Sequence, residues 1–189
     1  MTSHHLLLVP CGAAPAADIG VLISIAQGAG WSASVTATPS AVPFLDVSKV
    51  EELTGAAPRS GFEQAADPGK TRTVRKADAI IIAPATYNTV NKLAAGVADN
   101  YALTVVAELV GLGLPTVLVP FVNTALARRA PYRNALRALE AEGVYVLGAN
   151  DQWEPHEPGT GSKRQQQFPW QLAFDVAATH ANGTEVRNP

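Results

Sequence analysis

The stretch that decides the fold is residues 77–100, ADAIIIAPATYNTVNKLAAGVADN. It opens with an uninterrupted apolar run, Ala79–Ala83, which ends at Pro84. A continuous apolar run of this length is typical of a strand that is buried on both faces, and a proline terminates such a strand. The polar turn Thr86–Thr89 then leads into a segment with helical character. A buried strand, a polar turn and a helix in this order predict one unit of a parallel α/β sheet.

The same alternation of strand and helix extends in both directions along the chain. Further strands are predicted at Leu6–Val9, Ser34–Thr38, Thr116–Val119 and Val144–Leu147. Helices are predicted at Ala16–Ala29, Val47–Thr54, Val90–Leu112 with a break near Gly96, Thr124–Glu142 with a break at Pro131, and Gln165–Ala178. Right-handed crossovers place such helices on both faces of the sheet. We therefore expect a single α/β domain, a Rossmann-like doubly wound parallel sheet in three layers.

Composition limits what kind of protein this is. The 189 residues fit one domain, which we assign to residues 1–179, with residues 150–161 as a lid and residues 180–189 as a flexible tail. Only 16% of the residues are charged, against roughly 25% in a typical soluble domain, so we expect part of the surface to be an interface. The net charge of -2 and the lack of a basic stripe argue against nucleic acid as a partner.

Cysteine content and apolar runs bear on the compartment. The single cysteine, Cys11, cannot form an internal disulfide, and the first residues lack the basic and apolar regions of a signal peptide. The apolar runs fall far short of the roughly 18 residues that suggest a membrane span. We therefore expect a cytoplasmic protein that does not enter a membrane, and we predict no metal site.

The candidate site lies in the loops after the strands, because ligands of doubly wound sheets bind at the carboxyl ends of the strands. The first such loop holds Gly12 but lacks the G-x-G-x-x-G pattern, which argues against NAD. Its small residues, Gly12–Ala14, offer free backbone N–H groups that suit one phosphate, although a plain turn explains them equally well. Residues 68–71, PGKT, match the end of a Walker loop, but no buried strand precedes them, so we reject a nucleotide triphosphatase.

Residues 77–100 also carry a resemblance to a known family. Their spacing resembles the Pro-Ala-Ser-Ala-Asn-Thr and Gly-x-Ala-Asp-Asn motifs of the homo-oligomeric flavin-containing cysteine decarboxylases. That family includes phosphopantothenoylcysteine decarboxylases and the peptidyl-cysteine decarboxylases of aminovinyl-cysteine peptide biosynthesis. Three further segments stand at family motifs in the same order: Gly12–Ala14, Thr38–Ala41 with Phe44, and Pro120–Asn123. Residues 154–161 and 168–170 are similar to a group of small actinobacterial flavoproteins.

This resemblance implies FMN as the cofactor and oxidative decarboxylation of a cysteine to an enethiol as the reaction. The expected substrate is the C-terminal cysteine of a ribosomally made precursor peptide or a cysteine-containing small molecule, and the expected assembly is a homotrimer or a multiple of trimers. The implied cofactor-binding residues are Gly12, Ala13, Ala14, Thr38, Ser40, Phe44, Pro84, Ala85, Thr86, Thr89, Ala98, Asp99 and Asn100. The implied catalytic residues are Asn88, Asn123, Lys70 and His156.

Elementary chemistry agrees with this interpretation but leaves structural alternatives open. A single phosphate needs one turn and a few hydroxyl groups, and a flavin ring needs apolar walls. Yet Thr38 and Ser40 are equally typical of helix caps. Asn123 is also typical of an Asx-turn, and Asp99 and Asn100 of a helix start.

Two departures from the family pattern bear on the reaction. The family has a histidine fourteen residues before the motif proline, where this chain has Lys70, and no histidine lies between His5 and His156. Lys70 is also typical of a solvated surface residue, and His156 of a loop histidine bonded to the backbone. No cysteine follows Cys11, so we expect the product to remain an enethiol and the flavin to be reoxidised externally.

Two other functions fit the sequence. One is a flavoprotein of different chemistry, either a redox enzyme on a small molecule or a prenyl-flavin-type transferase. The other is a non-catalytic flavin-binding protein whose partner is another protein.

Overall fold

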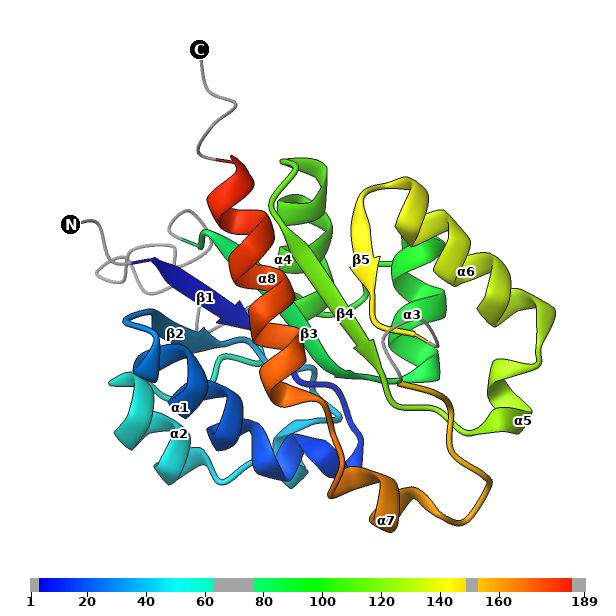
Figure 1. The fold of residues 1–189 in the computed structure, drawn as a ribbon, viewed down its shortest axis with the longest axis horizontal. Helices are drawn as coiled ribbons and strands as arrows, with labels where there is room; N and C mark the ends of the chain where they lie inside the picture. The colour runs from blue at the N-terminus through cyan, green and yellow to red at the C-terminus, as the bar shows by residue number, and fades with distance from the viewer. Residues whose placement is uncertain (1–3, 63–76, 149–152, 185–189) are drawn as a thin grey trace.

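The computed structural model describes residues 4–62, 77–148 and 153–184, which form a five-stranded sheet covered by helices (Figure 1). All strand pairs are parallel, in the order β2-β1-β3-β4-β5. The strands are β1 (His5–Leu8), β2 (Ser32–Val35), β3 (Ala79–Ala85), β4 (Thr116–Pro120) and β5 (Val144–Val146). The predicted doubly wound parallel α/β sheet is therefore confirmed.

Helices follow each strand and return the chain to the amino end of the sheet. They are η1 (Ala14–Asp18), α1 (Ile19–Gly28), η2 (Val42–Phe44), α2 (Val47–Thr54), α3 (Tyr87–Ala94), α4 (Tyr101–Gly111), α5 (Thr124–Ala127), α6 (Ala130–Ala141), α7 (Gly161–Gln165) and α8 (Trp170–Thr184). Local chemistry sets their ends. The carboxylate of Asp46, for example, accepts the Lys49 N–H at 3.0 Å at the start of α2, and Gly55 ends that helix at a φ of 76°.

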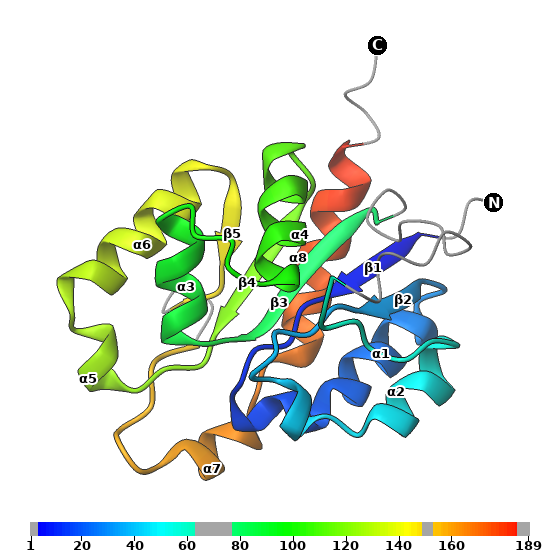
Figure 2. The ribbon, with the colours of Figure 1, turned by 180° about the vertical axis from the view of Figure 1, so that it is seen from behind.

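Two apolar cores lie on opposite faces of the sheet. Leu6 and Leu8 of β1 belong to the core under α1 and α8, whereas Leu7 and Val9 belong to the core under α3, α4 and α6. This alternation follows from the two-residue period of a strand. The α1 and α8 face is turned to the viewer in Figure 1, and the α3 and α4 face in Figure 2. The result is the expected three-layer arrangement.

The second strand begins earlier than the sequence indicates. It spans Ser32–Val35, whereas we expected Ser34–Thr38. Its two serines are tolerated because their hydroxyl groups lie 2.8 Å from the two ring nitrogens of His5 on the neighbouring strand. Thr38 already belongs to the loop, where its backbone N–H donates to the Pro10 carbonyl at 3.1 Å.

The predicted helices also differ in their boundaries. The break near Gly96 is real, but it separates two helices, α3 and α4, and α3 begins at Tyr87 rather than at Val90. The break predicted at Pro131 also separates two helices, α5 and α6, and Pro131 stands in the first turn of α6, where its missing N–H costs no hydrogen bond. The last helix continues to Thr184, into the segment that we assigned to a tail. Within the described residues, no helix has the length and apolar character needed to cross a membrane.

Candidate functional site

The strand order reverses between β1 and β3, because the chain first adds β2 on one side of β1 and then β3 on the other. In doubly wound sheets, ligands bind in the crevice at the carboxyl ends of the strands at this switch point. In flavodoxin, whose sheet has the same order 2-1-3-4-5, FMN binds at this switch point. The loops after β1, β2 and β3 are therefore the place to test the predicted cofactor residues.

The loops after β1 and β2 are in direct contact at Gly12 and Ser40. A Cβ atom added at Gly12 would lie 2.7 Å from the Ser40 carbonyl oxygen and 2.8 Å from its hydroxyl oxygen. Only glycine allows this approach. The Thr38 hydroxyl lies 3.3 Å from that of Ser40 and 3.4 Å from the Pro10 carbonyl oxygen. The structure therefore brings Gly12, Thr38 and Ser40 together, as the sequence analysis predicted, and neither hydroxyl caps a helix.

This turn has unused hydrogen-bond donors. Among the described residues, no acceptor takes the backbone N–H of Gly12 or of Ala14, whereas the Ala13 N–H donates to the Cys11 carbonyl at 2.7 Å. Ala14 begins η1, so its N–H is at the amino end of a helical turn. Two free amides beside the exposed hydroxyl of Ser40 fit one phosphate group. The donor set at this turn therefore suits a mononucleotide.

The apolar end of β3 lies beside the turn. Pro84 and Ala85 are buried, and their carbonyls accept the N–H groups of Cys11 at 3.1 Å and Phe121 at 2.8 Å. These bonds join the loops after β1 and β4 to β3. Phe44, on η2, is 41% exposed, so it can wall a flavin ring only where the ligand or another chain covers it.

Thr86 and Thr89 bond to each other at the start of α3. The Thr86 hydroxyl accepts the Thr89 N–H at 3.3 Å and lies 3.0 Å from the Thr89 hydroxyl, so this pair caps the helix. Thr89 is buried and contacts Cys11. Burial raises the pKa of the Cys11 thiol to about 11, against a weaker opposite effect of hydrogen bonds from Thr89, Thr86 and Thr38. Cys11 is therefore a neutral thiol at the junction of three loops.

The two predicted asparagines differ in their surroundings. Asn88, in the first turn of α3, is exposed. Asn123 follows β4 and caps α5, because its side-chain oxygen accepts the Leu126 N–H at 3.0 Å. Asn123 thus caps a helix, whereas the structural alternative from the sequence was an Asx-turn, and this cap uses only the side-chain oxygen. Among the described residues no acceptor takes the amide NH₂ of Asn123, which can still donate to a ligand.

The Ala98–Asn100 segment forms a helix start. The Asn100 side chain accepts the Leu103 N–H at 3.1 Å and caps α4, and its amide donates to Asp99 at 3.2 Å. Asp99 pairs with Lys92 at 2.5 Å, which lowers the pKa of that carboxyl. Since α4 ends where β4 begins, its first turn lies at the carboxyl edge of the sheet, the edge of the other loops (Figure 2).

His156 belongs to a segment that we name the strap, residues 153–160. Its N–H donates to Val122 at 3.2 Å and its carbonyl accepts the Thr124 N–H at 2.8 Å, so the strap is paired with the loop that carries Asn123. The His156 ring lies 4.8 Å from the Phe121 ring, centroid to centroid. Partial burial, together with the charge of Arg164, lowers its pKa. His156 is therefore a neutral imidazole at neutral pH.

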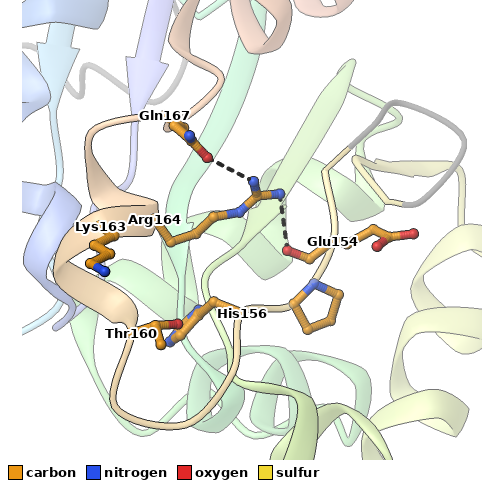
Figure 3. Close-up of a pocket in the computed structure, with 7 residues that line it drawn as sticks. Glu154, His156, Thr160, Lys163, Arg164 and Gln167 are labelled. Carbon is orange, nitrogen blue, oxygen red and sulfur yellow. Dashed lines mark hydrogen bonds between the residues drawn. The ribbon is translucent and has the colours of Figure 1, made fainter.

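Sequence reasoning missed two basic residues and could not place one that it named. Lys70 lies outside the described residues. Lys163 and Arg164, on α7, line a cavity of about 620 Å³ together with His156. Figure 3 shows Arg164 at this cavity, and its guanidinium lies 4.0 Å from the centre of the Trp153 ring. The sequence signal for Lys163 and Arg164 was their position after the glycine-flanked strap. No motif in the sequence connected these two residues with another part of the site.

These features define a class, a doubly wound α/β protein whose loops after β1 and β2 meet at the switch point of its sheet. The Flavoprotein family model matches residues 1–166, and the chain belongs to the Flavoprotein family. The resemblance stated from the sequence is therefore confirmed.

Solved structures agree with this assignment. The chain is similar to TvaF, an FMN-dependent cysteine decarboxylase from thioviridamide biosynthesis, with a TM-score of 0.73 and 26% identity over 95% of this chain and 98% of that one. It is also similar to the epidermin biosynthesis protein EpiD from Staphylococcus aureus, with a TM-score of 0.65 and 25% identity over 76% of this chain and 82% of that one. The prediction of FMN is confirmed, since the family is one of flavoproteins and the neighbours are FMN-dependent or FMN-binding.

A curated relative is the coenzyme A biosynthesis bifunctional protein CoaBC of Haemophilus influenzae, which is 25% identical over 153 residues. The match covers 79% of this chain and 38% of CoaBC, so the chain spans well under half of that relative.

Proposed function

We propose that the protein is an FMN-dependent decarboxylase that oxidises a cysteine and releases it as an enethiol, with the C-terminal cysteine of a peptide as its substrate. The observation that carries this proposal is the free amide NH₂ of Asn123 at the same sheet edge as the Gly12 and Ser40 turn. The similarity to cysteine decarboxylases such as TvaF supports it.

Different residues of the chain would bind the phosphate and the ring of FMN. The N–H groups of Gly12 and Ala14 and the hydroxyl of Ser40 would hold the phosphate of FMN, and Pro84 and Ala85 would support the ring. When bound, FMN supplies a two-electron oxidation of the substrate's Cβ–S bond to a thioaldehyde, whose C=S group takes the electron pair released with carbon dioxide and gives the enethiol.

Asn123 would orient the carboxylate that is lost. Its NH₂ can donate to that carboxylate while its oxygen stays fixed by the Leu126 N–H, so the donor direction is set by the α5 cap. The exposed side chain of Asn88, at the end of the neighbouring strand, would provide a second donor. Neither side chain adds a negative charge that would repel the substrate.

The thiol proton needs an acceptor at neutral pH. His156 would take it, because its lowered pKa keeps the ring neutral and its backbone is paired with the Asn123 loop. In this proposal Lys70 provides a positive charge in place of the family histidine. The strap acts as the lid, and a homotrimer covers exposed apolar residues such as Phe44.

Mass spectrometry tests the reaction. FMN-loaded protein is incubated with peptides that end in cysteine, and we expect a loss of about 46 mass units, the sum of carbon dioxide and two hydrogens. Asn88→Asp should abolish this loss and leave FMN bound, because a second carboxylate repels that of the substrate. If peptides of varied sequence remain unchanged while the protein holds FMN, the decarboxylase proposal is wrong and the other flavoprotein functions gain support.

A further inference from the structure

A cavity of about 620 Å³ lies between the strap and α7. We name it the basic cavity, and it is lined by Glu154, Pro155, His156, Thr160, Lys163, Arg164 and Gln167 (Figure 3). Four of these residues belong to the lid predicted at residues 150–161, and only His156 was assigned a catalytic role, whereas Lys163, Arg164 and Gln167 were assigned none. The basic cavity adjoins the candidate site, because His156 lines it and its backbone pairs with the loop of Asn123.

Arg164 is held in a fixed position at this cavity. Its guanidinium donates to the Glu154 carbonyl at 3.1 Å and to the Gln167 side-chain oxygen at 3.2 Å (Figure 3). The guanidinium also lies 4.0 Å from the centre of the Trp153 ring. Trp153 is itself anchored, since its indole N–H donates to the Pro120 carbonyl at 2.7 Å. A cation fixed by a ring, a carbonyl and an amide is preorganised for an anion.

None of these partners neutralises the charge of Arg164. In the described part of the chain no carboxylate pairs with Arg164 or with Lys163, and the carboxylate of Glu154 points away from the guanidinium in Figure 3. The Arg164 Nε–H is buried, and among the described residues no acceptor takes it. Buried donors in folded proteins nearly always have a partner, so the guanidinium is incompletely satisfied by the protein alone.

We propose that the basic cavity binds an anionic group of the substrate other than the carboxylate that is lost, so the protein selects cysteine derivatives with a second negative charge. The guanidinium of Arg164 suits a carboxylate or a phosphate, and Lys163 adds a second positive charge to the lining of the same cavity. The group is the side-chain carboxylate of a peptide residue near the cysteine, or the phosphate of a small acyl-cysteine. This inference rests on the proposed function, since it extends the same substrate from Asn123 to α7.

Matched pairs of unreactive ligands test the proposal. Each ligand ends in serine in place of cysteine, so binding to the FMN-loaded protein can be measured by calorimetry without turnover. One pair is a peptide with Glu or Gln before the serine, and the other is an acyl-serine with a terminal phosphate or hydroxyl group. We expect the anionic member of one pair to bind about tenfold tighter than its neutral twin, with the advantage shrinking as salt is added. Equal binding within both pairs, or no binding by any of the four ligands, would overturn the proposal.

Variants of the basic cavity test whether its positive charges cause the preference for the anionic ligand. Lys163→Gln and Arg164→Gln should each reduce the preference to about twofold or less, because each removes one charge. Lys49→Gln, which removes an exposed charge on α2, should leave it unchanged. If Arg164→Gln does not fold, the comparison uses Arg164→Lys together with Lys163→Gln, whose position is exposed. A preference that survives in both cavity variants refutes the inference. Because these ligands do not react, failure of decarboxylation with the preference intact would refute the proposed function alone.

Discussion

The indole N–H of Trp153 donates a 2.7 Å hydrogen bond to the backbone carbonyl of Pro120, and both residues are buried. Pro120 is the last residue of β4, whereas Trp153 begins the strap that carries His156. Phe168 packs against the Trp153 ring at 5.2 Å, between ring centroids. One buried hydrogen bond therefore attaches the strap to the edge of the sheet at the candidate site.

Replacing this indole tests how firmly the strap is attached. Trp153→Phe keeps an aromatic ring but leaves the Pro120 carbonyl without its donor, and a buried unpaired group costs about 1–3 kcal/mol. We expect the free energy of unfolding in urea to fall by about that amount. Trp170→Phe is the matched control, because the Trp170 ring packs on Phe168 and makes no hydrogen bond among the described residues. Equal losses in the two variants would show that the indole hydrogen bond contributes nothing.

The contact of Gly12 with Ser40 predicts sensitivity of cofactor binding to a single methyl group. In Gly12→Ala the new Cβ meets the Ser40 carbonyl oxygen at 2.7 Å, so the two loops must separate. We expect FMN affinity, measured by quenching of flavin fluorescence, to fall at least about tenfold. Gly28→Ala provides the control, since a Cβ at that helical position meets nothing within 4 Å and should leave affinity unchanged. Identical affinities in both variants would contradict the assigned phosphate turn.

The fold was predictable because its signal is local. Each residue of Ala79–Ala85 is buried, and an uninterrupted apolar run reports this directly. The element boundaries that were predicted wrongly depend on contacts with residues that are distant in sequence. Ser32 extends β2 beyond the predicted start at Ser34, and its hydroxyl lies 2.8 Å from a ring nitrogen of His5, a partner that the local sequence does not reveal.

The candidate site was predictable where a motif fixes the backbone and unpredictable where side chains from separate segments meet. Gly12 and Ser40 lie twenty-eight positions apart in sequence, yet each follows a strand, so topology alone brings them to one edge. Arg164 and Trp153 meet through the path of the strap, which has no regular secondary structure. Sequence periodicity carries no information about such a path, and the basic cavity was therefore missed.

The thiol of Cys11 gives the native protein a pH-dependent stability. Burial raises its pKa from 9.0 to about 11, so between these values the unfolded chain loses a proton that the folded chain keeps. The stabilising effect is complete below pH 9 and is lost as the pH rises toward 11. We expect the free energy of unfolding to fall more steeply between pH 9 and 10.5 in the wild type than in Cys11→Ala, and the native thiol to resist a disulfide reagent at pH 8. Rapid labelling of the folded protein at pH 8 would contradict this assignment.

Asn123 allows its capping role to be separated from its proposed substrate role. Asn123→Asp keeps an oxygen that accepts the Leu126 N–H, so stability should change little. It removes the NH₂ donor and adds a charge, so turnover should fall at least about a hundredfold, assuming two charge-assisted contacts are lost or reversed. Asn123→Ala should lose turnover and also about 1 kcal/mol of stability. The stability and the turnover of both variants are compared with the wild type by measuring unfolding curves and reaction rates on the same preparations. Full activity in Asn123→Asp would exclude the carboxylate role.

His156 should titrate below the usual histidine range, and its titration can be measured directly. Desolvation and then the charge of Arg164 lower its pKa below 6.5, so the folded chain keeps a neutral ring while the unfolded chain gains a proton as the pH falls through 6.5. Stability from this group is present above pH 6.5 and declines below it. NMR titration of the ring should give a pKa below 6.5 in the wild type and a higher value in Arg164→Gln, because one opposing charge is gone. Arg137→Gln, on the exposed face of α6, should leave the pKa unchanged.

The same titration connects His156 to turnover. If the neutral ring accepts the thiol proton, the acid limb of the pH–rate profile follows the pKa found by NMR and moves to higher pH with it in Arg164→Gln. An acid limb that persists unchanged in His156→Gln would assign the proton to another group and remove His156 from the reaction.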